Sequence, residues 1–238
     1  MKEIKEDINK FKEFQSKEVN AAIKELEGIT TESNRKHLQR LVYVNLVNRF
    51  DALVDNLLLK FSILDGPFKR KVLQETKDEE VFLKDIYEIL LSENPKNAVQ
   101  QRVENVARGK FLSLRHSLKL RILLYHCFSW PETDLNRPRV FTNNGSIFVA
   151  NKRLKPYQTP DTVIGYADWL YARRNALVHG DGKKLASKDL EFMQQKFDAK
   201  PASTISLKIS SIKSAVRFYD DLCKALSVPH DLVQGALE

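Results

Sequence analysis

The sequence predicts an all-α protein, because its apolar residues recur every three or four positions along most of the chain. The 8 glycines and 8 prolines among the 238 residues gather in a few places, which leaves long stretches without helix breakers. Strand signals are confined to residues 140–149 and 205–209. We therefore expect an up-and-down helical bundle over residues 31–228, with an N-terminal helical extension over 1–30 and a small β-hairpin inserted at 131–158.

Glycine and proline positions divide the first half of the chain into helices. An amphipathic helix is predicted over residues 2–27, where the apolar residues lie three and four apart. A second helix starts after Thr30 and Thr31, which can cap it, and runs to Leu64 before an Asp-Gly-Pro stop. Two shorter helices are expected at residues 68–75 and 79–91.

In the second half, a long helix is predicted from Asn94 to Trp130, which Pro131 ends. The Asn144-Gly145 pair between two short β-branched or aromatic runs is typical of a hairpin turn. Thr159 is placed to cap the next helix, with proline at its first position, and Gly180 ends it. Further helices are expected at residues 187–197 and 211–226, and the alternation at 205–209 is compatible with a short strand between them.

The two cysteines, Cys127 and Cys223, lie inside apolar helical patterns, which favours packed thiols over a disulfide framework. Residues 1–12 are charged and amphipathic, unlike a secretory signal. No apolar run approaches the roughly 18 residues of a membrane span. The sequence therefore predicts a cytoplasmic protein.

Lys and Arg outnumber Asp and Glu by 39 to 31, and the excess falls between Arg102 and Lys184. A basic region of this kind is typical of a protein that meets a polyanion such as RNA. A solvated helix face carries the same charges and stays as the alternative. Four basic residues around the candidate site described next are the expected RNA contacts: Arg153, Arg173, Lys183 and Lys184.

The strongest chemical signal is the stretch from Arg174 and Asn175 to His179, at a predicted helix end followed by a glycine-rich turn. Residues four apart share a helix face, so Asn175 can hydrogen-bond the imidazole of His179 and fix its tautomer. Arg174 lies to one side and can reach a phosphate in front of the imidazole. Imidazole exchanges protons near neutral pH, and a guanidinium stabilises the charge of a phosphorane. These groups suit RNA cleavage by the 2′-hydroxyl, which needs no metal or other cofactor, and the sequence shows no cluster with metal-ligand spacing.

The spacing alone decides nothing, because Arg121 and His126 repeat it. The residues between them are apolar or aromatic, so we expect His126 to be packed and Arg121 to lie on an exposed helix edge. The other three histidines, His37, His116 and His230, are expected at the surface. Trp130 and Trp169 are expected to anchor the core or the hairpin.

The residues around Arg174 resemble the HEPN superfamily, a group of small all-α domains found in prokaryotic defence and toxin systems and in RNA-processing proteins. Its signature is an Arg, usually followed by a polar residue such as Asn, and a His after four to six further residues on a late bundle helix. Arg174, Asn175 and His179 match it, and Gly180 after the His is similar to many members. The resemblance covers residues 38–226 as a fold pattern and is specific at 169–182.

The resemblance implies a HEPN-type bundle with endoribonuclease activity. It also implies a symmetric homodimer, because HEPN ribonucleases pair two Arg-His stretches across one cleft. An acidic residue often lies near the site on an earlier helix, and Asp51 is the nearest match here. A cognate antitoxin or another defence protein is the implied partner, although Asp181 stands where one toxin branch carries Tyr.

A second interpretation stays open from the residues themselves. His179 before a glycine can cap helix carbonyls, and Arg174 can pair with a carboxylate. The chain would then be a catalytically silent helical module that binds nucleotide, RNA or a partner protein.

Overall fold

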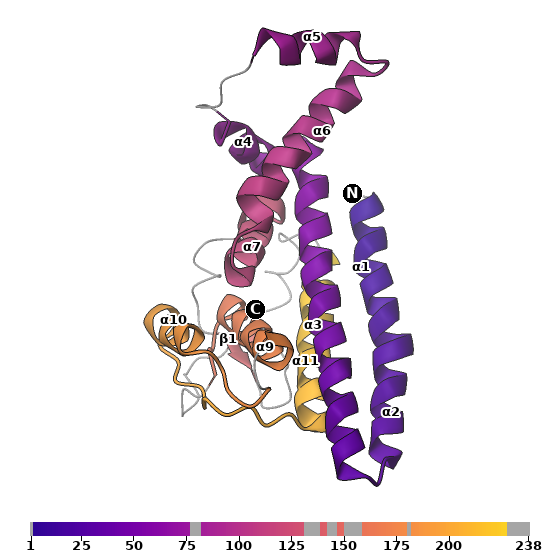
Figure 1. The fold of residues 1–238 in the computed structure, drawn as a ribbon, viewed down its shortest axis with the longest axis vertical. Coiled ribbons are helices and arrows are strands. Elements are labelled where there is room, and N and C mark those ends of the chain that lie inside the picture. Colours follow the sequence, from indigo (N-terminus) through magenta and orange to yellow (C-terminus); the bar gives the residue numbers. More distant parts are fainter. Residues whose placement is uncertain are drawn as a thin grey trace. The chain divides into compact units, whose positions relative to one another are not determined.

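The computed structural model describes residues 2–76, 82–130, 139–141, 147–149, 159–179 and 182–227. Its elements are helices, apart from two strands of three residues each, so the all-α class is confirmed (Figure 1). None of the described helices has both the length and the apolar character that crossing a membrane requires. The chain forms two compact units, the first from Met1–Leu53 with Trp130–Glu238 and the second from Val54–Ser129.

The first unit begins with a long helix made of α1 (Lys2–Phe14), a π turn (Gln15–Val19) and α2 (Asn20–Gly28). Its apolar residues repeat at helical spacing and are buried, Ile4, Ile8 and Phe11 among them. Both α1 and α2 contact α11 (Ile209–Ser227). Residues 1–30, which we expected as an extension outside the bundle, thus pack into the first unit.

Aromatic rings join these helices to the N-terminal part of α3 (Glu32–Ile63), the helix that contributes to both units. The rings of Phe50 on α3 and Tyr219 on α11 stack with their centroids 4.2 Å apart, and Phe11 of α1 meets Phe50 edge-on at 5.5 Å. All three side chains are buried. The core of the first unit therefore lies between α1, α3 and α11.

Helix α9 (Val163–His179) is attached to this core by Tyr43, whose hydroxyl donates to the carbonyl oxygen of Leu170 at 2.9 Å. The helix starts later than predicted, because Thr162 rather than Thr159 is its N-cap. The Thr162 Oγ1 accepts a hydrogen bond from the backbone N–H of Gly165 at 3.0 Å. A Cβ on Gly165 would lie 2.6 Å from Pro160 Cβ, so this turn requires glycine.

After α9 the chain forms α10 (Ser187–Phe197), which packs on α9 through a small cluster of Ala172, Leu185 and Met193. The strand considered at residues 205–209 is not formed, because Ile209 already begins α11. One isolated antiparallel bridge joins Lys184 to Thr204 instead.

Two strands, β1 (Arg139–Phe141) and β2 (Ile147–Val149), pair antiparallel with Val140 opposite Phe148. They fall within the segment where the sequence predicts a hairpin. The Asn144-Gly145 turn between them lies outside the described residues, as does the rest of 131–158.

The second unit contains α4 (Pro67–Gln74), α5 (Leu83–Leu91), α6 (Pro95–Ala107) and α7 (His116–Ile122). The single helix expected from Asn94 to Trp130 is interrupted, since the chain leaves helical geometry at residues 113–115. A π turn precedes this break at Arg108–Leu112, and another follows α7 at Leu123–Cys127.

The described part of this unit includes two ring pairs and an ion pair with a buried lysine. Phe68 meets Phe111 edge-on at 5.2 Å, and Phe61 meets Phe128 at the same centroid distance. Lys119, which is buried, donates to Asp55 at 2.7 Å.

Burial departs from the sequence expectations at His116 and at α5. His116, expected at the surface, is buried at the start of α7 with 1% of its area exposed, because the chain turns into a new helix there. Helix α5 buries none of its residues, although its apolar periodicity predicts a buried face. Trp130 is buried as expected, and both thiols, Cys127 and Cys223, are free.

Candidate functional site

Arg174 lies in the last two turns of α9, and its guanidinium is held on three sides. Its Nε donates to Oδ1 of Asn48 on α3, and its Nη1 donates to Oδ1 of Asn175 at 2.8 Å. The guanidinium carbon also lies 5.3 Å from the centroid of the Tyr171 ring, within cation–π range. The side chain is half-buried, and no hydrogen bond within the described residues engages Nη2. A guanidinium fixed through Nε and Nη1 still has the N–H groups of Nη2 to donate to an anion.

Asn48 is the residue that sequence reasoning missed. It lies on α3 among residues that are fully buried, namely Leu46, Val47 and Phe50. An amide at such a position needs a polar partner, and Asn48 finds it in Arg174. The sequence shows an amide between Val47 and Arg49 on a predicted helix, but nothing local identified its partner.

Asp51, the acidic residue proposed to support the site, lies three residues after Asn48 on the same helix. It is half-buried, and its negative charge adds to burial in raising the pKa of Tyr219 on α11. Within the described residues, the α3 side chain that contacts Arg174 is Asn48.

His179 is the last residue of α9, and its side chain is exposed. We expected Asn175 to hydrogen-bond the imidazole. The Asn175 oxygen instead accepts from Arg174, and His179 forms no hydrogen bond, ion pair or ring contact with any described residue. The structure thus brings Arg174 and Asn175 into contact and leaves the imidazole open to solvent at the same helix end.

The loop after α9 runs against the N-terminal part of α3. Gly182 is buried and has a φ of 69°, in the left-handed region that favours glycine. A Cβ there would lie 3.1 Å from Nη1 of Arg40. Arg40 therefore adds a second guanidinium, on an exposed residue, beside the loop that follows His179. Gly180 and Asp181 lie outside the described residues.

Arg173, predicted as an RNA contact, has a packing role instead. It is only 5% exposed, and its Nη2 donates to the carbonyl oxygen of Ser206 at 3.0 Å. Its guanidinium carbon lies 4.6 Å from the ring centroid of Trp169 and 5.5 Å from that of Tyr43. Successive helix residues point about 100° apart, so Arg173 faces the interior while Arg174 reaches the edge.

Two of the other predicted RNA contacts, Lys183 and Lys184, are exposed on the loop after Gly182. The backbone of this loop is fixed, because the carbonyl oxygen of Lys183 accepts from the N–H of Ile205 at 2.7 Å. Arg153 lies outside the described residues.

No group of three or more His, Cys, Asp or Glu side chains that could hold a metal ion occurs within the part of the chain that the structure describes. No protein family model, curated protein or solved structure matches the chain. The chemistry of the site is therefore argued from its own residues.

Proposed function

We propose that this protein is a metal-independent endoribonuclease that cleaves RNA by attack of the 2′-hydroxyl on the adjacent phosphate. The observation that carries the proposal is the fixed guanidinium of Arg174, whose Nη2 donates to none of the described residues, on the same helix end as the solvent-exposed imidazole of His179. A group that holds phosphate and a group that moves protons are the two requirements of this reaction.

In the proposed reaction, an imidazole removes the proton from the 2′-hydroxyl, and the 2′-oxygen attacks phosphorus. Nη2 of Arg174 donates to a non-bridging oxygen and stabilises the extra negative charge of the phosphorane. The bond from phosphorus to the 5′-oxygen then breaks, and the leaving oxygen takes up a proton from an imidazolium. The products are a 2′,3′-cyclic phosphate and a 5′-hydroxyl.

We further propose that two copies of the chain form one active centre. The reaction needs a base and an acid, and each chain supplies one histidine, His179, at this helix end. A two-fold axis beside α9 would supply both. Three exposed apolar side chains on the elements that carry the site suit such a contact: Leu38 and Leu41 of α3, and Val178 of α9.

RNA is the proposed substrate because of the exposed cations near His179. Lys183 and Lys184 follow on the next loop, and Arg40 lies beside Gly182. A role in prokaryotic defence or in a toxin–antitoxin pair, with a cognate partner protein, is part of the proposal through the HEPN resemblance alone.

The test is an RNA cleavage assay in EDTA with analysis of product ends. We expect the wild-type protein to release 2′,3′-cyclic phosphate ends and the Arg174→Ala/His179→Ala variant to release none. Products with 3′-hydroxyl and 5′-phosphate ends would contradict the proposal, because they indicate a metal-dependent route. Equal and negligible cleavage by both proteins would favour a silent module that binds nucleotide, RNA or a partner protein.

A further inference from the structure

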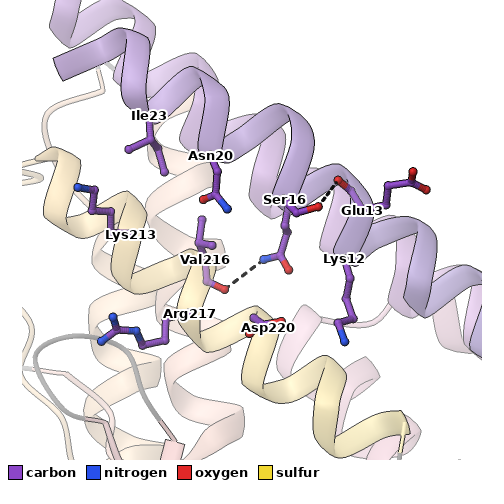
Figure 2. A pocket seen from close by; sticks show the side chains of 10 residues that line it. Lys12, Glu13, Ser16, Asn20, Ile23, Lys213, Val216, Arg217 and Asp220 are labelled. Atoms are coloured by element: carbon purple, nitrogen blue, oxygen red, sulfur yellow. Dashed lines mark hydrogen bonds between the residues drawn. The ribbon is translucent and has the colours of Figure 1, made fainter. Parts of the chain in front are cut away.

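A cavity of about 660 Å³ lies in the first unit between the N-terminal helix and α11 (Figure 2). Ser16, Asn20 and Ile23 line it from the N-terminal helix, and Val216 and Arg217 line it from α11. None of the residues that hold Arg174 takes part in its lining. Its volume falls in the range of about 300–1,000 Å³ that small-molecule sites occupy.

Gln15 provides the reason to expect a ligand in this cavity. The side chain lines the cavity, and the residue is only 3% exposed. Its Nε2 donates to the carbonyl oxygen of Val216 at 3.1 Å, while its Oε1 is buried without a hydrogen-bond partner. A buried acceptor without a donor is unfavourable, so a ligand that brings an N–H or O–H group would complete it.

The backbone at Gln15 is also unusual. The residue begins the π turn Gln15–Val19 between α1 and α2. Such turns occur frequently at functional sites, because the extra residue alters where neighbouring side chains point.

Each carboxylate that lines the cavity is paired with a lysine outside the lining. Glu13 is paired with Lys17, and Asp220 accepts from Lys224 at 2.7 Å, a lysine that also lies 3.4 Å from Asp221. The negative charge of Glu13 is therefore balanced, and that of Asp220 is balanced in part.

Two of the three cationic side chains that line the cavity have no ion-pair partner among the described residues. Lys213 is paired with Glu27 at 2.6 Å, but Lys12 and Arg217 form no ion pair with any described residue. In Figure 2 Lys12 and Lys213 lie toward opposite ends of the cavity, with Arg217 on the α11 side. Two uncompensated cations around a cavity with a buried acceptor favour an anionic ligand.

We propose that this cavity binds a small phosphate ester. An N–H or O–H group of the ester donates to Oε1 of Gln15, and the phosphate pairs with Lys12 or Arg217. The side chains of Ile23 and Val216 supply the apolar contact between the two ends. The site is independent of RNA cleavage, and its test does not use activity.

The test is calorimetric titration of the full chain with adenosine monophosphate and with glucose 6-phosphate, beside adenosine and inorganic phosphate as partial ligands. At least one ester should bind more tightly than about 1 mM and raise the melting temperature. Two variants should each weaken binding about tenfold or more: Gln15→Met, which removes the acceptor at similar volume, and Lys12→Ala/Arg217→Ala. Lys36→Ala, an exposed lysine of α3 paired with Glu32, is the matched control and should bind as the wild type does.

Three results would overturn the proposal. The first would be that neither ester binds more tightly than about 1 mM. The second would be that inorganic phosphate binds as tightly as both esters, and the third that the two variants bind the esters as the wild type does. Should Gln15→Met fail to fold, the double variant decides, because Lys12 is half-buried, Arg217 is exposed, and neither forms an ion pair with a described residue.

Discussion

The chain contains two stretches in which a histidine follows an arginine by five positions, and they lie in different units. Arg174 and His179 belong to α9 in the first unit, whereas Arg121 and His126 lie across the end of α7 and a π turn in the second. His126 is half-buried, with its ring edge-on to that of Tyr125 at 4.7 Å, whereas His179 is exposed.

The backbone geometry of the two stretches would favour Arg121 and His126 as the pair that shares a face. Residues five apart on an α-helix diverge by about 140°, whereas a π turn pairs residues five apart. The N–H of Phe128 donates to the carbonyl oxygen of Leu123 in this way, at 3.1 Å. What separates the two stretches is their surroundings. An amide from a distant helix fixes Arg174, whereas His126 lies against the ring of Tyr125 and precedes Cys127, the pKa of whose thiol is raised by burial.

The largest expected effect is on RNA cleavage by two histidine variants. His179→Ala should reduce the rate about 10²–10⁴-fold, because it removes the group that transfers protons. His126→Ala, the matched control, should cleave RNA at the wild-type rate per folded molecule. Initial rates in EDTA, corrected for the folded fraction, measure both. A similar loss in the two variants would show that the two stretches do not differ in function.

Three tyrosines and one thiol buried in the first unit should make its stability sensitive to alkaline pH. Burial raises the pKa of Tyr43 and Tyr219, and it raises those of Tyr166 and Cys223 to about 12 from ordinary values of 10.0 and 9.0. These groups favour the folded state while they are protonated. The stabilisation is complete below about pH 9 and is lost as the pH rises toward 12. Cys223 alone would contribute of the order of 4 kcal/mol to the free energy of unfolding.

Urea unfolding from pH 8 to pH 11, followed by circular dichroism and by tyrosinate absorbance, measures this effect. We expect the buried tyrosines of the first unit to ionise only as helical signal is lost. Full ionisation of all tyrosines with the helical signal intact would show that their burial is wrong.

The neighbouring residues Arg173 and Arg174 should give opposite phenotypes when each is replaced by methionine. Arg173→Met should lower the free energy of unfolding by about 2 kcal/mol, because it loses the hydrogen bond to Ser206 and two ring contacts. Arg174→Met should slow cleavage about 10²–10³-fold and lower the free energy of unfolding by less than about 1 kcal/mol, since the side chain is half-buried. Chemical denaturation and cleavage rates separate the two. If only Arg174→Met lost stability, Arg174 and not Arg173 would be the residue that stabilises the fold.

Asn48 should act through Arg174 and not on RNA directly. Asn48→Leu removes the acceptor for Nε of Arg174 and should lower kcat about tenfold, with little change in the Kd for RNA. Asn48→Asp keeps an acceptor oxygen at the same place and should restore most of the rate. If the Kd for RNA changes and kcat does not, Asn48 contacts the substrate instead.

The smallest effect concerns the exposed lysines after Gly182. Lys183→Gln and Lys184→Gln should each reduce the slope of log affinity against log salt concentration by about 0.7, provided that each contacts one phosphate of single-stranded RNA. Lys84→Gln, an exposed lysine of α5 in the second unit, should leave the slope unchanged. Fluorescence anisotropy at several salt concentrations measures the slope. Equal slopes for all three variants would exclude the loop as an RNA contact.

Local sequence signals predicted the helix ends and helical runs that depend on residues close together in the chain. The stop after Leu64 and the glycines after His179 mark two helix ends, and the long run of helical spacing predicts α3. The placement of Arg174 and Asn175 at the end of one helix follows from the same pattern.

Contacts between distant segments could not be predicted in this way. Asn48 and Arg174 are 126 positions apart, and no periodicity links them. The burial of Arg173 depends on which face of α9 meets Tyr43 and Trp169. The break at residues 113–115 was missed because it contains neither glycine nor proline. The exposed face of α5 shows that amphipathicity specifies a helix without specifying what covers it.

The adjacent positions of Arg173 and Arg174 make α9 sensitive to its own length. Deleting or inserting one residue between Thr162 and Ala172 would rotate everything after it by about 100°. A deletion would carry Arg174 to the interior position of Arg173 and Arg173 to the buried position of Ala172, whereas an insertion would carry Arg173 to the edge and Arg174 one position beyond it. A substitution along this stretch changes one side chain, but a single insertion or deletion would remove both guanidinium groups from their present contacts.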